Sequence, residues 1–546
     1  MKKRLSDLSF GNAVINSLLL SALLMTMVMY LSTVSSTLVA GKIVGNNALS
    51  AINLVTPLYN YATFFSGIIG IGSPLLYFRY IGAYKKDRAD EIFGQSIILS
   101  ISIGVAMFIV MSVIETPYLD SLNIGNEIRY EAEQFWKFER FLVAIAPFDF
   151  LLFELLCADT NLIIKGNIAF FTIGIGSSIV FTKMFGTMGT SMGMFLGTLV
   201  CDIILCTHFF RKTNEFKFKF HISFKDIKEV LSLSLVDSST YLDCGLLVTF
   251  INKFVLTHFS EKMLPITAIM VTILDITVVF DCVGSAFAPV SEVYLGENNN
   301  NNEKDVARYS LFISFIFGLI FTLIFIIGAP IFPKFFEIED AYQASLLVKI
   351  IRLFAPSMLL YSLSYMLISH YIAIRKITMA VIMEWSKAFI APVICITIFG
   401  NIFGFIGMWS SFFIAQVLCT ICFLIYIKLF SNKEKSIWLL ENNDCPSFSR
   451  SYYANETNII ASRNDIESFL LNNSINKNVI NKIMITVEDM TNLIMQNNPN
   501  KKVILQYDVL IKEDGIYLYE RDNGNIYDLT NSDINISNFN EYIFRL

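Results

Sequence analysis

The chain has 546 residues, which is too long for one ordinary domain. Hydrophobic residues make up 54% of it and charged residues only 16%, whereas soluble domains are roughly 25% charged. The composition therefore excludes an ordinary soluble protein and indicates an integral membrane protein. Residues 431–546 carry 11 basic and 16 acidic side chains, and the rest of the chain carries 30 of each. This neutral-to-acidic balance argues against nucleic acid as a partner.

Apolar stretches of about 20 residues, long enough to cross a bilayer as helices, recur through the first 430 residues. We expect twelve of them, which gives an all-α polytopic membrane body. Residues 1–210 would form an N-terminal six-helix lobe, 211–228 a basic cytoplasmic connector, and 229–430 a C-terminal six-helix lobe. The predicted segments are 12–37, 50–78, 92–114, 136–157, 163–182, 189–210, 229–256, 264–294, 309–331, 345–371, 378–399 and 405–429.

The loops between these segments differ in charge. Basic residues gather at 85–88, in the connector and at 375–376, which lie on one side of the membrane if the segments alternate. Acid-rich loops at 115–133 and 337–340 fall on the other side. The positive-inside rule therefore predicts that both the N- and the C-terminus are cytoplasmic.

One stretch of the sequence occurs twice. Residues 72–82 (GSPLLYFRYIG) precede a charged run at 85–91, and residues 284–296 (GSAFAPVSEVYLG) precede a polar run at 303–308. Each run leads into a new apolar segment. A membrane protein built from two related halves has a cleft between them, and transporters bind substrate in such clefts.

This repeated unit resembles the multidrug and toxic compound extrusion (MATE) transporters. The helix entry at 45–57 (GNNALSAINLVTP) and the helix ends at 80–83 (YIGA) and 294–296 (YLG) carry the resemblance, which covers roughly residues 10–430. The resemblance implies two lobes around a V-shaped cleft. It also implies efflux of drugs or metabolites, driven by a proton or sodium gradient.

Ionisable side chains inside predicted spans are candidate sites, because an unpaired charge there costs several kcal/mol. A carboxylate in the cleft can exchange a proton or a sodium ion and can attract a cationic substrate. The main candidates lie on the first two helices of the C-terminal lobe, and the N-terminal lobe offers three more. In chain order the candidates are Asp149, Glu154, Asp202, Asp237, Asp243, Asp275 and Asp281.

Some of these acids have a plainer interpretation. Asp149 and Glu154 lie about 140° apart around a helix, so both need not face the cleft. Asp202 could instead bond a neighbouring helix. Glu384 and Lys387 are spaced i, i+3 on one helix face, which favours a structural ion pair over a role in transport.

The first predicted helix departs from the family pattern. Many MATE transporters carry an aspartate late in this helix, and here Ser36 takes that place. A hydroxyl can coordinate sodium but does not titrate near neutral pH. The substitution puts proton coupling through the N-terminal lobe in question, and the sequence leaves H⁺ and Na⁺ open as coupling ions.

From residue 431 the sequence predicts a small cytoplasmic α+β domain, with a helix at 479–495 before strands near 503–507 and 515–519. Glu488 and Asn492, followed by Asp522 and Gly524, resemble the N and G1 boxes of histidine-kinase-type (GHKL) ATPases of the anti-sigma-factor-like branch. The resemblance implies that Glu488 orients water and Asn492 binds Mg²⁺ of Mg-ATP. It also implies that Asp522 accepts a hydrogen bond from adenine and that Gly524 gives room beside it.

The GHKL resemblance is incomplete. The glycine-rich lid of that fold has no counterpart before Leu546, and no phospho-acceptor histidine region is visible. These departures favour a degenerate regulatory or nucleotide-sensing domain over an active kinase.

These patterns predict a multi-pass protein of a bacterial inner membrane that is a transporter and not an enzyme. It would export small organic, cationic compounds in exchange for H⁺ or Na⁺, with the lipid bilayer as its surroundings and a cytoplasmic regulatory protein as a candidate partner of its tail. Two alternatives remain open at this stage. One is a membrane-anchored signalling protein whose tail binds ATP or a partner, and the other is a flippase for lipid or polysaccharide precursors.

Overall fold

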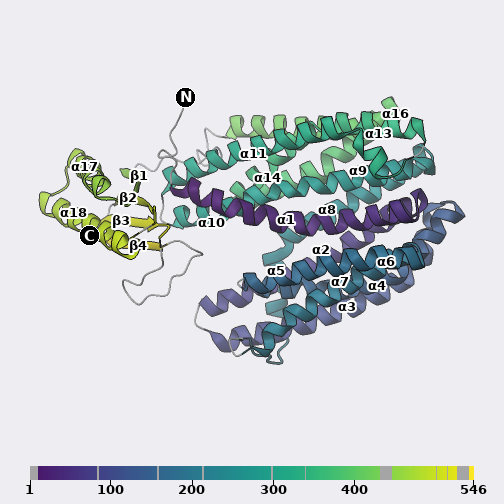
Figure 1. Cartoon of the computed structure of the whole chain (residues 1–546), viewed down its shortest axis with the longest axis horizontal. Coiled ribbons are helices and arrows are strands. Elements are labelled where there is room, and N and C mark those ends of the chain that lie inside the picture. Colours follow the sequence, from purple (N-terminus) through teal and green to yellow (C-terminus); the bar gives the residue numbers. More distant parts are fainter. Residues whose placement is uncertain are drawn as a thin grey trace.

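The computed structural model describes residues 10–545 with gaps at 83–84, 157–158, 212–213, 215, 297–298, 339, 431–445, 500, 513–514 and 525–539. Two bundles of long helices lie side by side, and a small domain of two helices and a sheet lies at one end of them (Figure 1). We call this small domain the tail, the end of the bundles that it meets the tail side, and the opposite end the far side.

The first bundle contains six successive helical segments, of which the fifth is built from three consecutive pieces. Each of the first six predicted segments falls on one of them. They are α1 (Phe10–Ile43), α2 (Asn46–Gly82), α3 (Lys86–Leu122), α4 (Asn126–Leu155), the run α5 (Thr160–Ala169), η2 (Phe170–Ile175) and α6 (Gly176–Phe185), and α7 (Thr187–Cys206) with η3 (Thr207–Phe210).

The second bundle repeats this order after the connector, and the other six predicted segments fall on it. Its elements are α8 (Phe224–His258), the run η4 (Glu261–Met263), α9 (Leu264–Ile276), η5 (Thr277–Phe280) and α10 (Asp281–Gly296), then α11 (Asn300–Gly328), α12 (Ile331–Phe335), the bent pair α13 (Ala341–Phe354) and α14 (Ser357–Ala373), and the run α15 (Ile377–Trp385), η6 (Ser386–Ile390) and α16 (Ala391–Phe430).

By length and composition alone, seven helical stretches of the described chain can cross a membrane, and the bent pair α13–α14 would add an eighth. One of the seven, Ile377–Tyr426, runs through the non-helical Gly404 inside α16 and so covers two of the predicted segments. The protein is a multi-pass membrane protein, and the helix order agrees with twelve crossings.

The two bundles share local features that mark them as copies. The fifth segment of each contains a π-helical stretch, η2 in the first and η6 in the second. The sixth segment of each begins after a glycine of the same conformation, Gly186 at φ 63° and ψ −146° and Gly404 at φ 66° and ψ −151°. The repeat signalled by the sequence is therefore a repeat of structure.

These two glycines lie in a sequence repeat that the sequence analysis missed. Phe185-Gly186 and Phe403-Gly404 are each followed, three residues after the first glycine, by a second one. A Cβ on Gly189 would lie 2.1 Å from the backbone of Phe181, and one on Gly407 would lie 2.2 Å from the backbone of Phe399. The first glycine turns the chain and the second lets the two helices meet closely.

Short polar residues set several helix ends. The Asp340 side chain accepts from the backbone N–H groups of Tyr342 and Gln343 at the start of α13, at 2.8 and 3.1 Å. Asn123 ends α3 in the left-handed conformation. Both are residue types that satisfy the free backbone groups of a helix end.

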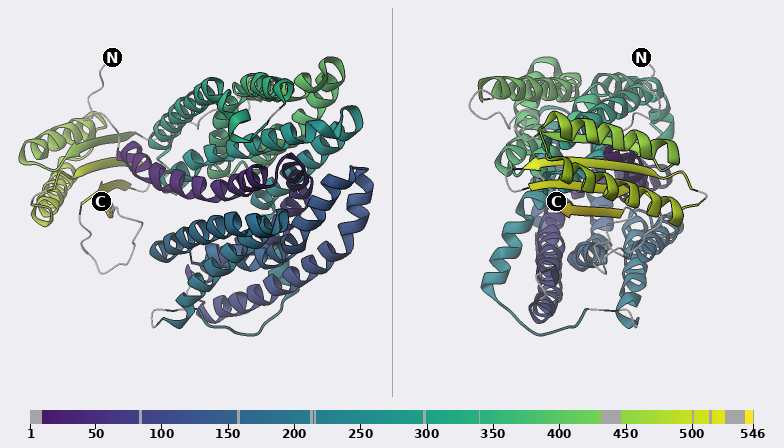
Figure 2. Two further views of the ribbon diagram at one scale, coloured as in Figure 1. Left: turned by 45° about the vertical axis from the view of Figure 1, so that its right-hand side comes forward. Right: turned by 90° about the vertical axis from the view of Figure 1, so that its left-hand side faces the viewer.

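The apolar cores of the bundles join on the far side and separate on the tail side. One buried cluster contains residues of both bundles, among them Leu49, Trp136, Ile251 and Ile269. The buried Asn53 and Asn252 side chains bond across it at 2.6 Å. Toward the tail side the cores divide into separate clusters, and the ribbons diverge there (Figure 2).

The tail is an α+β domain, as the sequence predicts. Its antiparallel sheet has the order β1 (Ser447–Tyr453), β2 (Ile504–Lys512), β3 (Gly515–Asp522), β4 (Asn540–Arg545). Helices α17 (Glu456–Asn472) and α18 (Lys477–Asn497) cover one face of it. The other face is turned toward the bundles (Figure 2).

We expect Gly186→Ala to destabilise the protein. Its φ and ψ lie in a region open essentially to glycine alone, so a Cβ there costs about 1–3 kcal/mol of folding free energy. Thermal unfolding of the detergent-solubilised protein measures the loss. Gly176→Ala is the matched control, since Gly176 is helical and a Cβ there meets open space; an equal effect of both changes would contradict the argument.

Candidate ion and substrate site

Two predicted acids of the first bundle meet inside it. Asp149 of α4 is partly buried and Asp202 of α7 is 6% exposed. Their carboxyl groups are close enough to interact with each other, and Asp202 Oδ1 is buried without a hydrogen-bond partner among the described residues. Two ionised carboxylates buried side by side repel each other, so the pair favours holding one proton. The pair is a place where the first bundle can hold a proton.

Groups from two other helices lie close to this pair. Tyr59 of α2 is near the carboxyls of Asp149 and Glu139 and also near Tyr241 of α8. Glu139 is 5% exposed in α4. The acidic region of the first bundle therefore extends to the boundary with the second bundle. Glu139 was missed as a site candidate, although an acid within a predicted span could have drawn attention to it.

The second bundle holds a cluster of charges around Lys387. The Lys387 ammonium lies 2.8 Å from Glu384 Oε2 and 3.2 Å from the centre of the Tyr365 ring. Asp243 of α8, 2% exposed, is close enough to interact with both Glu384 and Lys387. When both acids are ionised, the two carboxylates and one ammonium carry a net charge of −1, which a proton or a bound cation can neutralise.

A π-helical stretch shapes this cluster. Lys387 lies in η6, where the regular α-helical ladder is interrupted. The Lys387 carbonyl accepts from Gln416 Nε2 of α16 at 3.0 Å, which joins η6 to α16. Single π-turns within α-helices are frequent at functional sites. The sequence analysis interpreted Glu384 and Lys387 as a structural pair, and the pair forms, with Asp243 beside it.

The remaining predicted acids are not gathered into these clusters by any contact that we describe. Asp275 accepts a weak bond from Cys244 Sγ at 3.9 Å, and Asp281 accepts from Ser285 Oγ at 3.3 Å. Glu154 is exposed at the tail side of α4. The backbones of Ser36 and Asp237 belong to α1 and α8, and their side chains lie outside the described part of the chain.

Known proteins share the arrangement of the helices. Residues 21–182 match the MatE family. The inward-facing conformation of a multidrug resistance MATE family transporter of the MOP superfamily superposes with a TM-score of 0.69, at 18% identity, over 77% of this chain and 98% of that one. The chain has the MATE transporter fold.

Two further MATE-fold structures match over nearly their whole length. One is a MOP superfamily transporter from Pyrococcus furiosus described by the reverse polarity of its binding pocket (TM-score 0.65, 18% identity, 80% of this chain and 99% of that one). The other is the outward-facing conformation of a multidrug resistance MATE family transporter (0.63, 19%, 80% and 100%). No curated protein sequence matches the chain.

The MATE-fold body carries the tail, where the predicted nucleotide-site residues lie on α18 and at the end of β3. Asp522 ends β3 fully buried, and its Oδ1 accepts from the Gly524 N–H at 2.6 Å. A Cβ on Gly524 would lie 2.6 Å from both Asn498 Nδ2 and Asp522 Oδ1, so these two side chains would have to shift to accept it. On α18, Glu488 accepts from Arg463 Nη1 of α17 at 2.6 Å. Asn492 is exposed on the same helix.

A second buried acid lies next to Asp522. Glu520 is two residues earlier on β3, faces the same side of the sheet, and is fully buried opposite Tyr507 of β2. Burial and the neighbouring Asp522 carboxyl raise the pKa of Glu520 well above its ordinary range. The sequence analysis did not single out Glu520, because an acid within a strand usually faces water.

Glu384→Gln should destabilise the MATE-fold body by about 3–5 kcal/mol, because it removes the paired counter-charge of the buried Lys387. The double variant Glu384→Gln with Lys387→Met should recover most of this loss, since it removes both members of the ion pair and Asp243 can then take up a proton. Thermal unfolding in detergent compares the two. A double variant as unstable as the single one would show that the pair is not the cause.

The stability of the tail should fall as pH rises. The folded tail keeps a proton on Glu520 that the unfolded tail releases above the ordinary carboxyl pKa of about 4.3. The free energy of unfolding therefore decreases from that pH up to the raised pKa. Protease resistance of the tail in the full-length protein measures this.

Glu520→Gln should remove this pH dependence. Glu467→Gln, at an exposed position of α17, should leave it in place. A pH profile that is the same in wild type and Glu520→Gln would contradict the assignment to Glu520.

Proposed function

We propose that the protein is a secondary active antiporter that exports organic cations in exchange for protons by alternating access. The closeness of the buried Asp149 and Asp202 carboxyls on two different helices carries the proposal. It supports a proton as the coupling ion, since one bound proton relieves the repulsion between two neighbouring carboxylates. In this account Asp149 supplies the acid that Ser36 does not.

The substrate class follows from charge and from the ring near the cluster. The second bundle holds Asp243, Glu384 and Lys387 together, with the Tyr365 ring over the ammonium. When Asp243 is ionised, this group carries a net negative charge that attracts a cation. The MATE-fold relatives described as multidrug resistance transporters support export of organic compounds.

We infer that the tail side faces the cytoplasm and that the protein is open on that side. The basic loops at 85–88 and 375–376 lie at the tail side, where α3 and α15 begin, and the positive-inside rule favours this orientation. The cores that join on the far side and divide on the tail side support an inward-open state. In this orientation the tail is a cytoplasmic regulatory or nucleotide-sensing domain.

In the antiport cycle, proton binding and cation binding exclude each other. A proton that enters from the outside neutralises one carboxyl of the Asp149–Asp202 pair and weakens the attraction for a cation. Each ligand favours the state in which it binds better, so the two biases drive the rocking of one bundle against the other. The Glu384–Lys387 pair stays intact and holds α15 and α16 in place around Asp243.

Asp149→Asn and Asp202→Asn should each reduce efflux driven by a pH gradient at least tenfold, because an amide has nearly the same shape as the carboxyl but cannot exchange a proton. Efflux of a cationic dye from proteoliposomes, measured against pH and sodium gradients separately, tests this. Glu154→Gln is the matched control on the same helix, since Glu154 is exposed. Flux that follows sodium and ignores pH would refute proton coupling.

A further inference from the structure

The polar face of the tail sheet is buried, although the two helices of the tail, α17 and α18, cover the other face. Successive residues of a strand point to opposite faces. Leu505, Tyr507 and Val509 of β2 face α17 and α18. Gln506 and Asp508 face the other way and are 1% and 0% exposed. In an antiparallel sheet such a face ordinarily meets water, so the tail side of the bundles must cover it here.

Asp508 is the centre of the contact between the tail and the bundles. Its Oδ1 accepts from Asn302 Nδ2 of α11 at 3.0 Å and from Gln506 Nε2 at 2.9 Å, and its Oδ2 lies 2.5 Å from Arg521 Nη1. Tyr294 of α10 donates its hydroxyl to Gln506 Oε1 at 2.9 Å. Buried, charge-assisted bonds of this kind are the strong class.

The tail also contacts the start of α1. Ser451 Oγ of β1 accepts from the Phe10 backbone N–H at 2.9 Å. The first turns of α1 pack against α10 and α11, and Asn16 Nδ2 bonds Tyr309 of α11 at 2.7 Å. The first helix of the first bundle therefore has its tail-side end on the second bundle, while its far-side end packs against α2, α6 and α7 of its own bundle.

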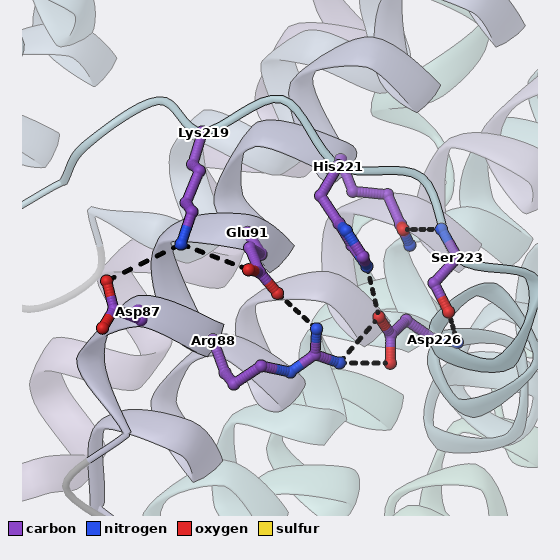
Figure 3. A network of polar contacts seen from close by, with 8 residues as sticks. Asp87, Arg88, Glu91, Lys219, His221, Ser223 and Asp226 are labelled. Carbon is purple, nitrogen blue, oxygen red and sulfur yellow. Dashed lines mark hydrogen bonds and ion pairs between the residues drawn. The ribbon is translucent and has the colours of Figure 1, made fainter.

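The first helix of the second bundle crosses in the same way, and the connector holds it. Figure 3 shows the contacts: Arg88 of α3 lies 3.1 Å from Asp226 in the first turn of α8, and Lys219 of the connector lies 3.2 Å from Glu91. The Ser223 N–H donates to Gln95 Oε1 at 2.8 Å. The tail-side end of α8 is thus held on the first bundle.

Arg88 and Asn302 hold equivalent positions in the repeat. Arg88 is the third residue of α3 and Asn302 is the third residue of α11, and these are the third helices of their bundles. Arg88 meets Asp226 of α8 itself, and Asn302 meets Asp508 of the tail.

Asn302 stands at a rigid junction. The next residue, Glu303, accepts from Ser291 Oγ of α10 at 3.0 Å and lies 3.2 Å from His370 Nδ1 of α14. All three side chains are buried. A displacement of Asn302 would therefore be transmitted to α10, α11 and α14 of the second bundle together.

We propose that the tail sheet is a strap that holds the crossed end of α1 on the second bundle and stabilises the state open on the tail side. Rocking to the opposite state changes how α1 lies between the bundles. Contacts that form only while the tail-side end of α1 is held on the second bundle therefore favour the state open on the tail side. Arg521 and Asp522 are successive residues of β3 on opposite faces of the sheet. A ligand that moves the strand at Asp522 would thereby loosen or tighten the strap.

This inference rests on the alternating access proposed above, but its test needs neither substrate nor coupling ion. Spin labels on unnatural side chains at Lys165 of α5 and Ile377 of α15, both exposed near the tail side, report the distance between the bundles. In the full-length protein, Tyr294→Phe with Asn302→Ala removes two donors to the tail. It should raise the ratio of tail-side-closed to tail-side-open molecules at least fivefold.

The matched control is Arg450→Ala, which breaks an exposed ion pair to Asp465 within the tail and touches no bundle residue in the contacts described. It should leave the ratio unchanged. An unchanged ratio in the double variant, with its tail still resistant to protease, would overturn the proposal.

A second variant separates the effect of the tail contact from any loss of stability caused by the substitutions. Asn301 Nδ2 and Ser447 Oγ are 2.8 Å apart across the contact, so Asn301→Cys with Ser447→Cys can be cross-linked. In a background without the nine native cysteines, the cross-linked protein should lose the tail-side-closed population and regain it after reduction. A cross-linked protein that still reaches the closed state would also overturn the strap.

Discussion

The crossing of the first helix of each half onto the other half is the constraint on which the rest of the molecule depends. α1 and α8 each begin on one bundle and end against the other, so neither bundle can be separated from its partner without unpacking a helix. The far-side core, with its buried Asn53–Asn252 pair, fixes where the bundles meet. The tail-side ends are then free to move only as far as the connector and the tail allow.

Inside the two bundles, buried charges are compensated in two different ways. The first bundle brings two carboxyls together with no base among the described contacts of the pair, so a proton or a bound cation must compensate them. The second brings a lysine against a glutamate and so keeps a permanent ion pair beside Asp243. The halves are copies in their backbone and not in their chemistry. In the proposed cycle this asymmetry separates the group that exchanges a proton from the group that positions the helices.

Much of the fold and part of the site could be predicted from the sequence. The apolar segments each fall on helices, because a run of hydrophobic residues reports on the solvent locally. The tail helix and strands were predicted for the same reason, from periodicity. Asp149, Asp202 and Asp243 were chosen individually because any acid in a span is unusual. Their partners could not be predicted. Asp149 and Asp202 lie on different helices that are far apart in the sequence. Asp243 lies beside Glu384 and Lys387, and no contact described joins it to Asp237.

The sequence by itself determined the number and order of the helical segments, the repeat, and the alternation of polar and apolar residues along β2 and β3. These are local properties that follow from hydrophobicity and backbone period. Only the tertiary structure decided that Gln506, Asp508 and Arg521 face protein instead of water. The sequence pattern of a polar strand face is the same whether its hydrogen bonds are made to water or to Asn302 and Tyr294. The partner that satisfies them is more than 200 residues away along the chain.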